Sequence, residues 1–213
     1  MKNFDYQTPT RLVFGKGVVN DKLESVMNQY GKRVLVTYGG GSIKRKVAGH
    51  AKSLYEEVMD ILVGKEVYEL PGIQPNPKFQ PSVLEGVRLC QEHQIDVILS
   101  VGGGSVLDCT KAIAGVAGTL KGKVYDHVEE AWDLVRGLQP TTAAVPIVDI
   151  ITMAATGSEY DMGGVISRTE TNDKLPYFSP LVFPAVSFID PTYTFSVPVK
   201  HTLAGVADCI NHI

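Results

Sequence analysis

The stretch DVILSVGGGSVLDCTK, from Asp96 to Lys111, decides the fold. It begins with a short apolar run, typical of a buried parallel strand, and passes through three glycines into a segment with apolar residues at helical spacing. Ser105, with Asp108 three residues later, resembles the capping box that starts a helix. The stretch therefore predicts a strand, a tight turn and a helix in direct succession, the repeating unit of an α/β sheet.

The rest of the chain continues this alternation of short β-branched runs with longer helical patterns. The expected strands are residues 11–14, 33–38, 66–70, 96–101, 143–148 and 186–189. The expected crossover helices are residues 18–30, 44–63, 80–94 and 106–120. Four prolines in residues 71–81 make that segment an ordered loop. The pattern predicts a Rossmann-like parallel sheet with helices on both faces.

Composition and charge exclude several functional classes. The chain has 213 residues, is 44% hydrophobic, and carries 20 basic and 23 acidic side chains, for a net charge of −3. With no basic stripe, no nucleic-acid partner is expected. No apolar leader or run of about 18 apolar residues is present, so we expect a cytoplasmic protein without a membrane partner. The three widely spaced cysteines are expected to be small buried hydrophobes.

The glycine turn at residues 102–105 carries the sharpest local chemistry. Glycines let backbone N–H groups approach a ligand, and a helix N-terminus offers unpaired donors with a partial positive charge. A pyrophosphate fits this arrangement. The alternative is an ordinary glycine-rich turn, common in α/β proteins, because the sequence is not the G-x-G-x-x-G fingerprint.

A second GGGS string, at residues 39–42, bears on the choice of cofactor. NAD-preferring sites usually place a carboxylate after an early strand, to bind the ribose 2′-hydroxyl. Here glycines and serine are followed by Lys44, Arg45 and Lys46, which favours NADP(H) over NAD(H). The alternative is that these three cations form a solvated first helical turn. A third polar cluster, TMAATGSE at residues 152–159, follows a later apolar run.

Taken together, the motifs resemble the iron-containing (group III) alcohol dehydrogenase family. They are F-G-x-G at residues 14–17, P-N-P at 75–77, GGGSxxDxxK at 102–111, TGSE at 156–159, D-P at 190–191 and G-x-x-D-x-x-x-H at 205–212. The branch that the chain resembles most contains NADPH-dependent aldehyde reductases and butanol dehydrogenases, which share YGGGS, VISRTETNDKL and SPLVFP in similar form.

The resemblance implies a dinucleotide-binding domain of the dehydroquinate synthase-like fold over residues 1–192. Residues 193–213 would begin a truncated, all-helical, metal-binding domain. In the complete enzyme, a hydride would pass between NAD(P)H and a small aldehyde or primary alcohol, within a homo-oligomer. The implied cofactor-binding residues are Gly39, Gly41, Ser42, Asn76, Gly103, Gly104, Ser105, Asp108, Thr152, Thr156 and Lys174. The alternative is a catalytically inactive nucleotide-binding module.

Asp208 and His212 are the candidate metal ligands. Their i, i+4 spacing puts both on one helix face, and a carboxylate with an imidazole suits a divalent ion such as Fe²⁺ or Zn²⁺. The resemblance points to the same two positions, and it implies that two further histidines come from the missing C-terminal helical domain. From spacing alone, the alternative is an ordinary pair on a solvated face. A catalytic site needs about three protein ligands, so this chain alone is expected to hold metal weakly and to lack activity.

The remaining histidines and the last apolar residues complete these expectations. His201 lies too far along the helix to share the metal of Asp208. The other three, His50, His93 and His127, are expected on the solvated surface. Apolar residues recur at helical spacing at positions 203, 206, 207, 210 and 213, and should form a bare face where the helical domain would pack.

Overall fold

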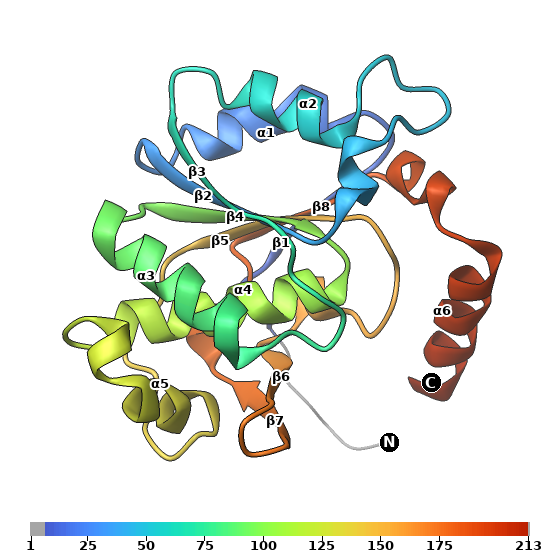
Figure 1. Ribbon diagram of the computed structural model, residues 1–213. Coiled ribbons are helices and arrows are strands. Elements are labelled where there is room, and N and C mark those ends of the chain that lie inside the picture. Colours follow the sequence, from blue (N-terminus) through green and yellow to red (C-terminus); the bar gives the residue numbers. More distant parts are fainter. Residues whose placement is uncertain (1–6, 213) are drawn as a thin grey trace.

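The computed structural model describes residues 7–212, and side chains as far as residue 211. Its centre is a six-stranded sheet in the order β1-β8-β5-β4-β2-β3, with every neighbouring pair parallel (Figure 1). The strands are β1 Arg11–Phe14, β2 Arg33–Tyr38, β3 Glu66–Leu70, β4 Val97–Gly102, β5 Ile147–Ile151 and β8 Val186–Ile189. The predicted parallel α/β sheet is confirmed.

Helices cover both faces of this sheet, as predicted. In Figure 1, α1 and α2 lie on one side, and α3, α4 and α5 lie on the other. The helices are α1 Val18–Met27, α2 Leu54–Ile61, α3 Leu84–His93, α4 Gly104–Thr119, α5 Val128–Val135 and α6 Val199–His212. Strand alternation produces the two cores, because Leu35 of β2 joins the cluster around α3 and α4 whereas Val34 and Val36 join the cluster around α1 and α2.

Two predicted helices are shorter than their apolar periodicity indicated. Of the segment 44–63, Lys44 ends a short 3-10 turn, η1 Gly41–Lys44, and only residues 54–61 form an α-helix, α2. Ser53 begins α2 with a complete capping box to Glu56, and Gly49 before it has φ +89°, so the helix starts ten residues late. In the segment 80–94 the α-helix begins only at Leu84. It follows a short π-helical turn, η2 Phe79–Val83, in which Gln80, which precedes a proline, is extended.

Other elements were shifted or not predicted. The strand expected at 143–148 is β5, which begins after Pro146 because a proline cannot donate to the ladder. The helix α5 and an antiparallel hairpin, β6 Gly163–Arg168 and β7 Asp173–Phe178, were not predicted. The hairpin packs closely on α4, since a Cβ at Gly115 would lie 1.8 Å from the Tyr177 hydroxyl.

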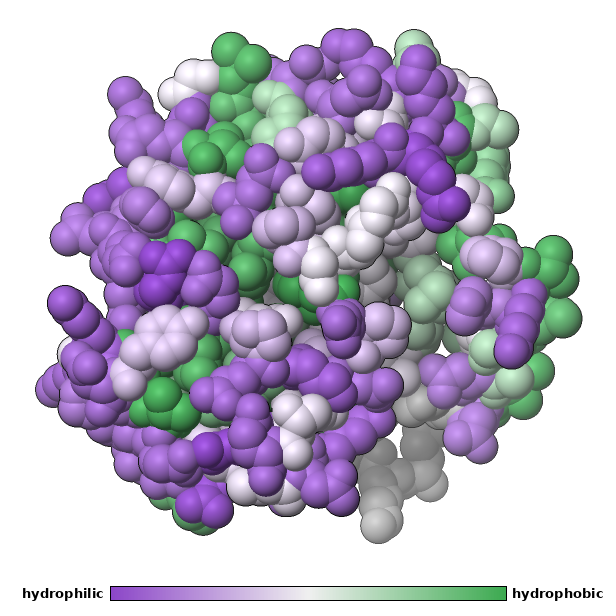
Figure 2. Space-filling view, in the orientation of Figure 1, coloured by the Kyte–Doolittle hydropathy of each residue, from purple (hydrophilic) through white to green (hydrophobic). Residues whose placement is uncertain are grey.

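The last helix, α6, stands at the side of the α/β layers (Figure 1). Its apolar side chains are bare, as predicted for Leu203, Val206, Ala207 and Ile210, whereas Ile213 lies outside the described residues. In the space-filling view, apolar colour gathers over this part of the surface (Figure 2). None of the helices within residues 7–212 is long and apolar enough to cross a membrane.

The cysteines and histidines divide between the core and the surface. Cys90 and Cys109 are buried as expected, but the expectation is wrong for Cys209, which is exposed because it lies on α6. His127 is exposed, and His93 is partly buried with its ring stacked on Tyr68.

Candidate functional site

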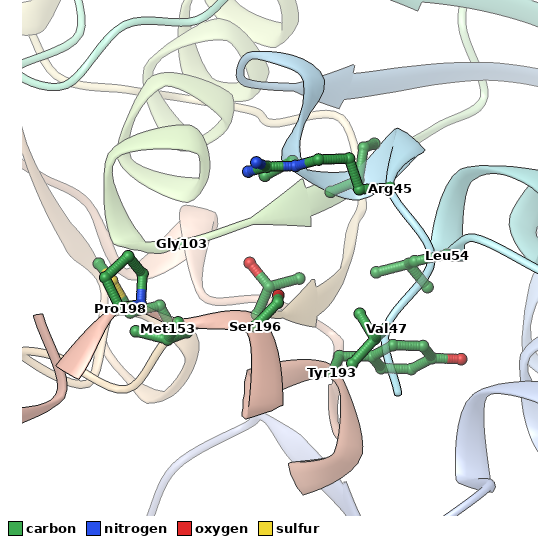
Figure 3. A pocket seen from close by; sticks show the side chains of 12 residues that line it. Arg45, Val47, Leu54, Gly103, Met153, Tyr193, Ser196 and Pro198 are labelled. Atoms are coloured by element: carbon green, nitrogen blue, oxygen red, sulfur yellow. The ribbon is translucent and has the colours of Figure 1, made fainter. Parts of the chain in front are cut away.

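A pocket of about 250 Å³ opens where the strands β2, β4 and β5 end, and we call it the sheet-edge pocket. Its lining comes from five separate parts of the chain, and Figure 3 shows its labelled side chains. The lining residues are Ser42, Ile43, Arg45, Val47, Leu54, Gly103, Thr152, Met153, Tyr193, Ser196, Val197 and Pro198. Carboxyl ends of parallel strands are where open α/β sheets bind ligands, so this is the leading candidate site.

The N-terminus of α4 lies at this pocket. Gly103 is its N-cap residue and forms no side-chain cap, so the capping box predicted from Ser105 and Asp108 is wrong. The Asp108 carboxylate instead accepts hydrogen bonds from the Ser158 hydroxyl at 2.8 Å and the Val165 N–H at 3.0 Å. The first N–H groups of a helix have no intrahelical partners, and here no cap side chain occupies them. These donors and the helix dipole suit an anionic ligand.

The glycines of this turn serve different purposes. A Cβ at Gly102 would lie 2.7 Å from Val106, so packing of the protein itself requires a glycine there. A Cβ at Gly103 would lie 3.6 Å from Met153, which is ordinary contact, and φ at Gly103 is −89°. This extended backbone conformation is open to any residue. Neither packing nor backbone strain requires this glycine, and its missing side chain keeps open a pocket that Gly103 and Met153 both line.

A buried lysine on α4 holds the third polar cluster in place. Lys111 is fully buried, and its ammonium group donates to Asp161 Oδ1 at 2.6 Å, the Ser158 carbonyl at 2.7 Å and the Gly163 carbonyl at 2.7 Å. It also contacts the Ser158 hydroxyl at 3.0 Å. Site prediction from sequence missed this role. The available signal was a lysine on a helix whose neighbouring positions, 109–116, are almost entirely apolar or small.

A second buried network joins α2 to the 3-10 turn η6 Pro191–Ser196. The Tyr193 hydroxyl donates to Glu57 Oε2, and burial, followed by this hydrogen bond, raises the pKa of Tyr193. His50 lies between the two elements, with Nδ1 3.2 Å from Glu57 Oε1 and Nε2 2.8 Å from Thr192 Oγ1. The expectation that His50 is solvated is therefore wrong. The network positions Tyr193, whose ring lines the sheet-edge pocket.

A hydrogen bond joins the D-P motif to the F-G-x-G motif at the start of η6. Asp190 accepts hydrogen bonds from the Thr192 hydroxyl at 2.7 Å and from the Gly17 N–H at 2.6 Å. Gly17 has φ +79°, a left-handed conformation that favours glycine. These two motifs therefore secure the connection from the sheet to α6.

A buried carboxyl group lies in the middle of β5. Burial raises the pKa of Asp149 well above its ordinary value, against the lowering effect of its hydrogen bond with Ser187. The Ser187 hydroxyl also lies 2.7 Å from the Glu159 carbonyl oxygen. One hydroxyl proton cannot serve both acceptors at once, which favours a protonated Asp149 that donates to Ser187. The other carboxyl oxygen, Oδ2, is buried and has no hydrogen-bond partner among the described residues.

The predicted cofactor residues fall into separate places. Ser42, Gly103 and Thr152 line the sheet-edge pocket. Gly104 and Ser105 begin α4, Gly39 lies between β2 and η1, and Gly41 is the first residue of η1. Asp108 lies in the second turn of α4, and burial raises its pKa. Thr156 is exposed on the loop after β5.

Asn76 and Lys174 line a different pocket of about 310 Å³ beside the β6–β7 hairpin. The Lys174 ammonium donates to Asn76 Oδ1 at 2.6 Å, and Asn76 has φ 54°. The structure therefore brings these two residues together as a pair. It separates them from the sheet-edge pocket, with which this second pocket shares no lining residue.

The described residues do not supply a complete metal site. Asp208 lies on α6, and the side chain of His212 lies outside the described residues. Among the side chains that the structure does describe, no three histidines, cysteines or carboxylates are grouped as metal ligands. Because a catalytic site needs about three protein ligands and an open position, these residues do not fit a catalytic ion by themselves.

A third pocket, of about 560 Å³, separates α6 from the loop after β5. Its lining is mostly apolar and includes Met153, Phe195, Val206 and Ile210, together with His201. Met153 also lines the sheet-edge pocket, so the two pockets adjoin. At one point α6 approaches the loop closely, since a Cβ at Gly205 would lie 3.0 Å from the Ala154 carbonyl oxygen.

A parallel sheet with a glycine turn, an uncapped helix N-terminus and a pocket at the strand ends defines the class of α/β proteins that bind nucleotides at this edge. The sequence matches the family described as iron-containing alcohol dehydrogenase over residues 9–191. The chain belongs to this family, and the resemblance inferred from its motifs is confirmed.

Similar proteins and structures agree with this membership. The chain is 46% identical to the probable NADH-dependent butanol dehydrogenase 1 of Bacillus subtilis, and 38% identical to an NADPH-dependent aldehyde reductase of Escherichia coli. In both comparisons 100% of this chain and 51% of the relative are covered. The crystal structure of an NADH-dependent butanol dehydrogenase A from Thermotoga maritima superposes with a TM-score of 0.86 at 37% identity, covering 100% of this chain and 50% of that one. The chain thus spans about half the length of these relatives.

Proposed function

We propose that this chain is the cofactor-binding half of an NAD(P)-dependent oxidoreductase that interconverts small aldehydes and primary alcohols. Relatives named as butanol dehydrogenases and an aldehyde reductase support this substrate class. Their twofold greater length supports a second half, and we propose that it completes the active site in a homo-oligomeric enzyme. The division of the sequence at residues 192 and 193 is part of the same proposal.

The uncapped N-terminus of α4 at the sheet-edge pocket is the observation that carries the proposal. Its free N–H groups would bind the pyrophosphate, with Gly103, Gly104 and Ser105 at the point of closest approach. Gly39, Gly41 and Ser42 would lie along the adenosine ribose, while Thr152 and Thr156 would border the remainder of the dinucleotide. Asp108 would act indirectly, because its carboxylate holds Ser158 and Val165.

The dinucleotide, when bound, supplies or accepts the hydride. The residues of this chain bind and orient it, and Asn76 and Lys174 would extend the site toward the hairpin. The apolar pocket beside α6 would exclude water and accept a short alkyl chain, because its lining holds few polar groups. Asp208 and His212 are proposed as two of the metal ligands, with the others coming from the second half.

Titration of the whole 213-residue chain with NADPH and NADH tests the proposal. Ligand at 100 times its dissociation constant should stabilise the chain by about 2.7 kcal/mol, seen as a rise in the unfolding temperature. A chain that shows no shift with either dinucleotide would contradict nucleotide binding at this edge.

The alternative is a nucleotide-binding module without catalysis, favoured by the absence of a three-ligand metal cluster among the described side chains. We expect no equimolar metal by elemental analysis. We also expect no change at the NADPH absorbance band with butanol and NADP⁺, even with added Fe²⁺ or Zn²⁺. Turnover with a tightly held ion would instead show that further ligands are supplied, most simply by another copy of the chain.

A further inference from the structure

Arg45 carries the single charge among the described residues that line the sheet-edge pocket. Figure 3 shows its side chain along one side of the pocket, just after the end of η1, with Tyr193 and Ser196 on the opposite side. Arg45 is exposed, and no hydrogen bond or ion pair to its guanidinium occurs within the described part of the chain. The pocket therefore presents a positive charge that no carboxylate among the described side chains neutralises.

The two neighbouring lysines are directed elsewhere. The Lys44 ammonium lies 4.4 Å from the ring centroid of Tyr55 and 5.1 Å from that of Tyr38, as cation–π contacts. Both tyrosine hydroxyls donate to Glu69, which adds negative charge to the same cluster. Lys44 does not line the pocket, and its charge is held over these two tyrosine rings.

Lys46 also acts outside the pocket. Lys46 is exposed and is not among the residues that line it. Its charge contributes to the lowered pKa of Glu56, which hydrogen bonds from Ser53 lower most. Of the three consecutive cations at residues 44–46, only Arg45 is thus available to a ligand in the pocket.

The pocket also lacks a group that would favour a free ribose. None of its described lining residues is acidic, and the nearby Glu57 is engaged by the Tyr193 hydroxyl. A carboxylate would accept a hydrogen bond from a ribose 2′-hydroxyl and repel a 2′-phosphate. The electrostatics therefore favour an anion in this part of the pocket.

We propose that Arg45, with the Ser42 hydroxyl beside it, binds the 2′-phosphate of NADPH and is the residue that discriminates NADPH from NADH. The proposal rests on nucleotide binding in the sheet-edge pocket. A guanidinium can donate two parallel hydrogen bonds to phosphate, and Arg retains its charge at any working pH. Lys44 and Lys46 contribute no discrimination.

The test compares dissociation constants for NADPH and NADH, measured by fluorescence titration of the full chain and its variants. Arg45→Gln should weaken NADPH binding by about tenfold to one hundredfold, the range for losing a hydrogen bond to a charged group. Its NADH affinity should stay within about twofold. Arg45→Lys should keep most of the preference, and Arg45→Glu should reverse it. Added salt should reduce the preference of the wild-type chain, but not of Arg45→Gln.

Lys44→Gln and Lys46→Gln are the matched controls, and both should leave the ratio of the two affinities unchanged. Circular dichroism confirms folding, which the exposed position of Arg45 should preserve. Equal loss of both dinucleotides in Arg45→Gln, or no loss of either, would overturn the role of Arg45 while nucleotide binding stands. A wild-type chain that binds NADH and NADPH equally would overturn it too. Failure of the wild-type chain to bind either dinucleotide would remove both the proposed function and this inference.

Discussion

Lys111→Met should destabilise the chain and weaken nucleotide binding together. The substitution removes a fully buried ammonium that bonds two backbone carbonyls and the Asp161 carboxylate. The Asp161 side chain is about half exposed, so water compensates for most of the ion pair that Asp161 loses. The Ser158 and Gly163 carbonyls then account for the cost, at about 1–3 kcal/mol for each buried acceptor left without its donor.

The free energy of unfolding should therefore fall by roughly 3 kcal/mol, and for a chain of this length the unfolding temperature should fall by roughly 6–12 °C. Because Lys111 holds residues 158–163 against α4, amide exchange should accelerate in that segment before the rest of the fold opens. NADPH affinity should fall as the adjoining loop with Thr152 loosens.

Calorimetry, hydrogen exchange by mass spectrometry and NADPH titration measure these three effects. Lys121→Met is the matched control, because Lys121 is exposed and follows the same helix. It should change stability by no more than about 0.5 kcal/mol. If Lys111→Met were as stable as the control, with unchanged exchange at residues 158–163, the ammonium would not be the group that holds this segment.

The remaining predictions concern the buried acid, the glycine turn and α6. Because the folded pKa of Asp149 is raised, its stabilising contribution is present below its unfolded pKa of about 3.9 and is lost as pH rises through the folded pKa. Asp149→Asn should abolish that decline in the free energy of unfolding as pH rises above about 4, measured by denaturant unfolding at a series of pH values; parallel wild-type and variant curves would contradict this prediction. Gly103→Val should prevent nucleotide binding with unchanged far-UV circular dichroism, whereas Gly40→Ala, at a position with open space, should bind normally. The bare face of α6 should cause self-association, which Leu203→Glu with Ile210→Glu should reduce in sedimentation experiments; a strictly monomeric wild-type chain would contradict this.

Local pattern was sufficient for the alternation of strands and helices, the two glycine turns and the family. Each of these depends on residues close together in sequence, such as the passage from an apolar strand through Gly102–Gly104 into α4. The same reasoning failed for the capping box at Ser105. Its spacing was correct, but a contact with Ser158, fifty residues further along, occupies the Asp108 carboxylate instead.

Long-range contacts decided which candidate residues share a site. Tertiary packing turned Lys44 onto two tyrosine rings and left Arg45 in the pocket, whereas the sequence does not show which of three consecutive cations faces a ligand. It also placed Asn76 with Lys174 in a separate pocket, across 98 positions of sequence. Sequence determined the order of the elements because strand and helix patterns are local. Only the fold decided the chemistry of each side chain, because burial and partners depend on segments that meet in three dimensions.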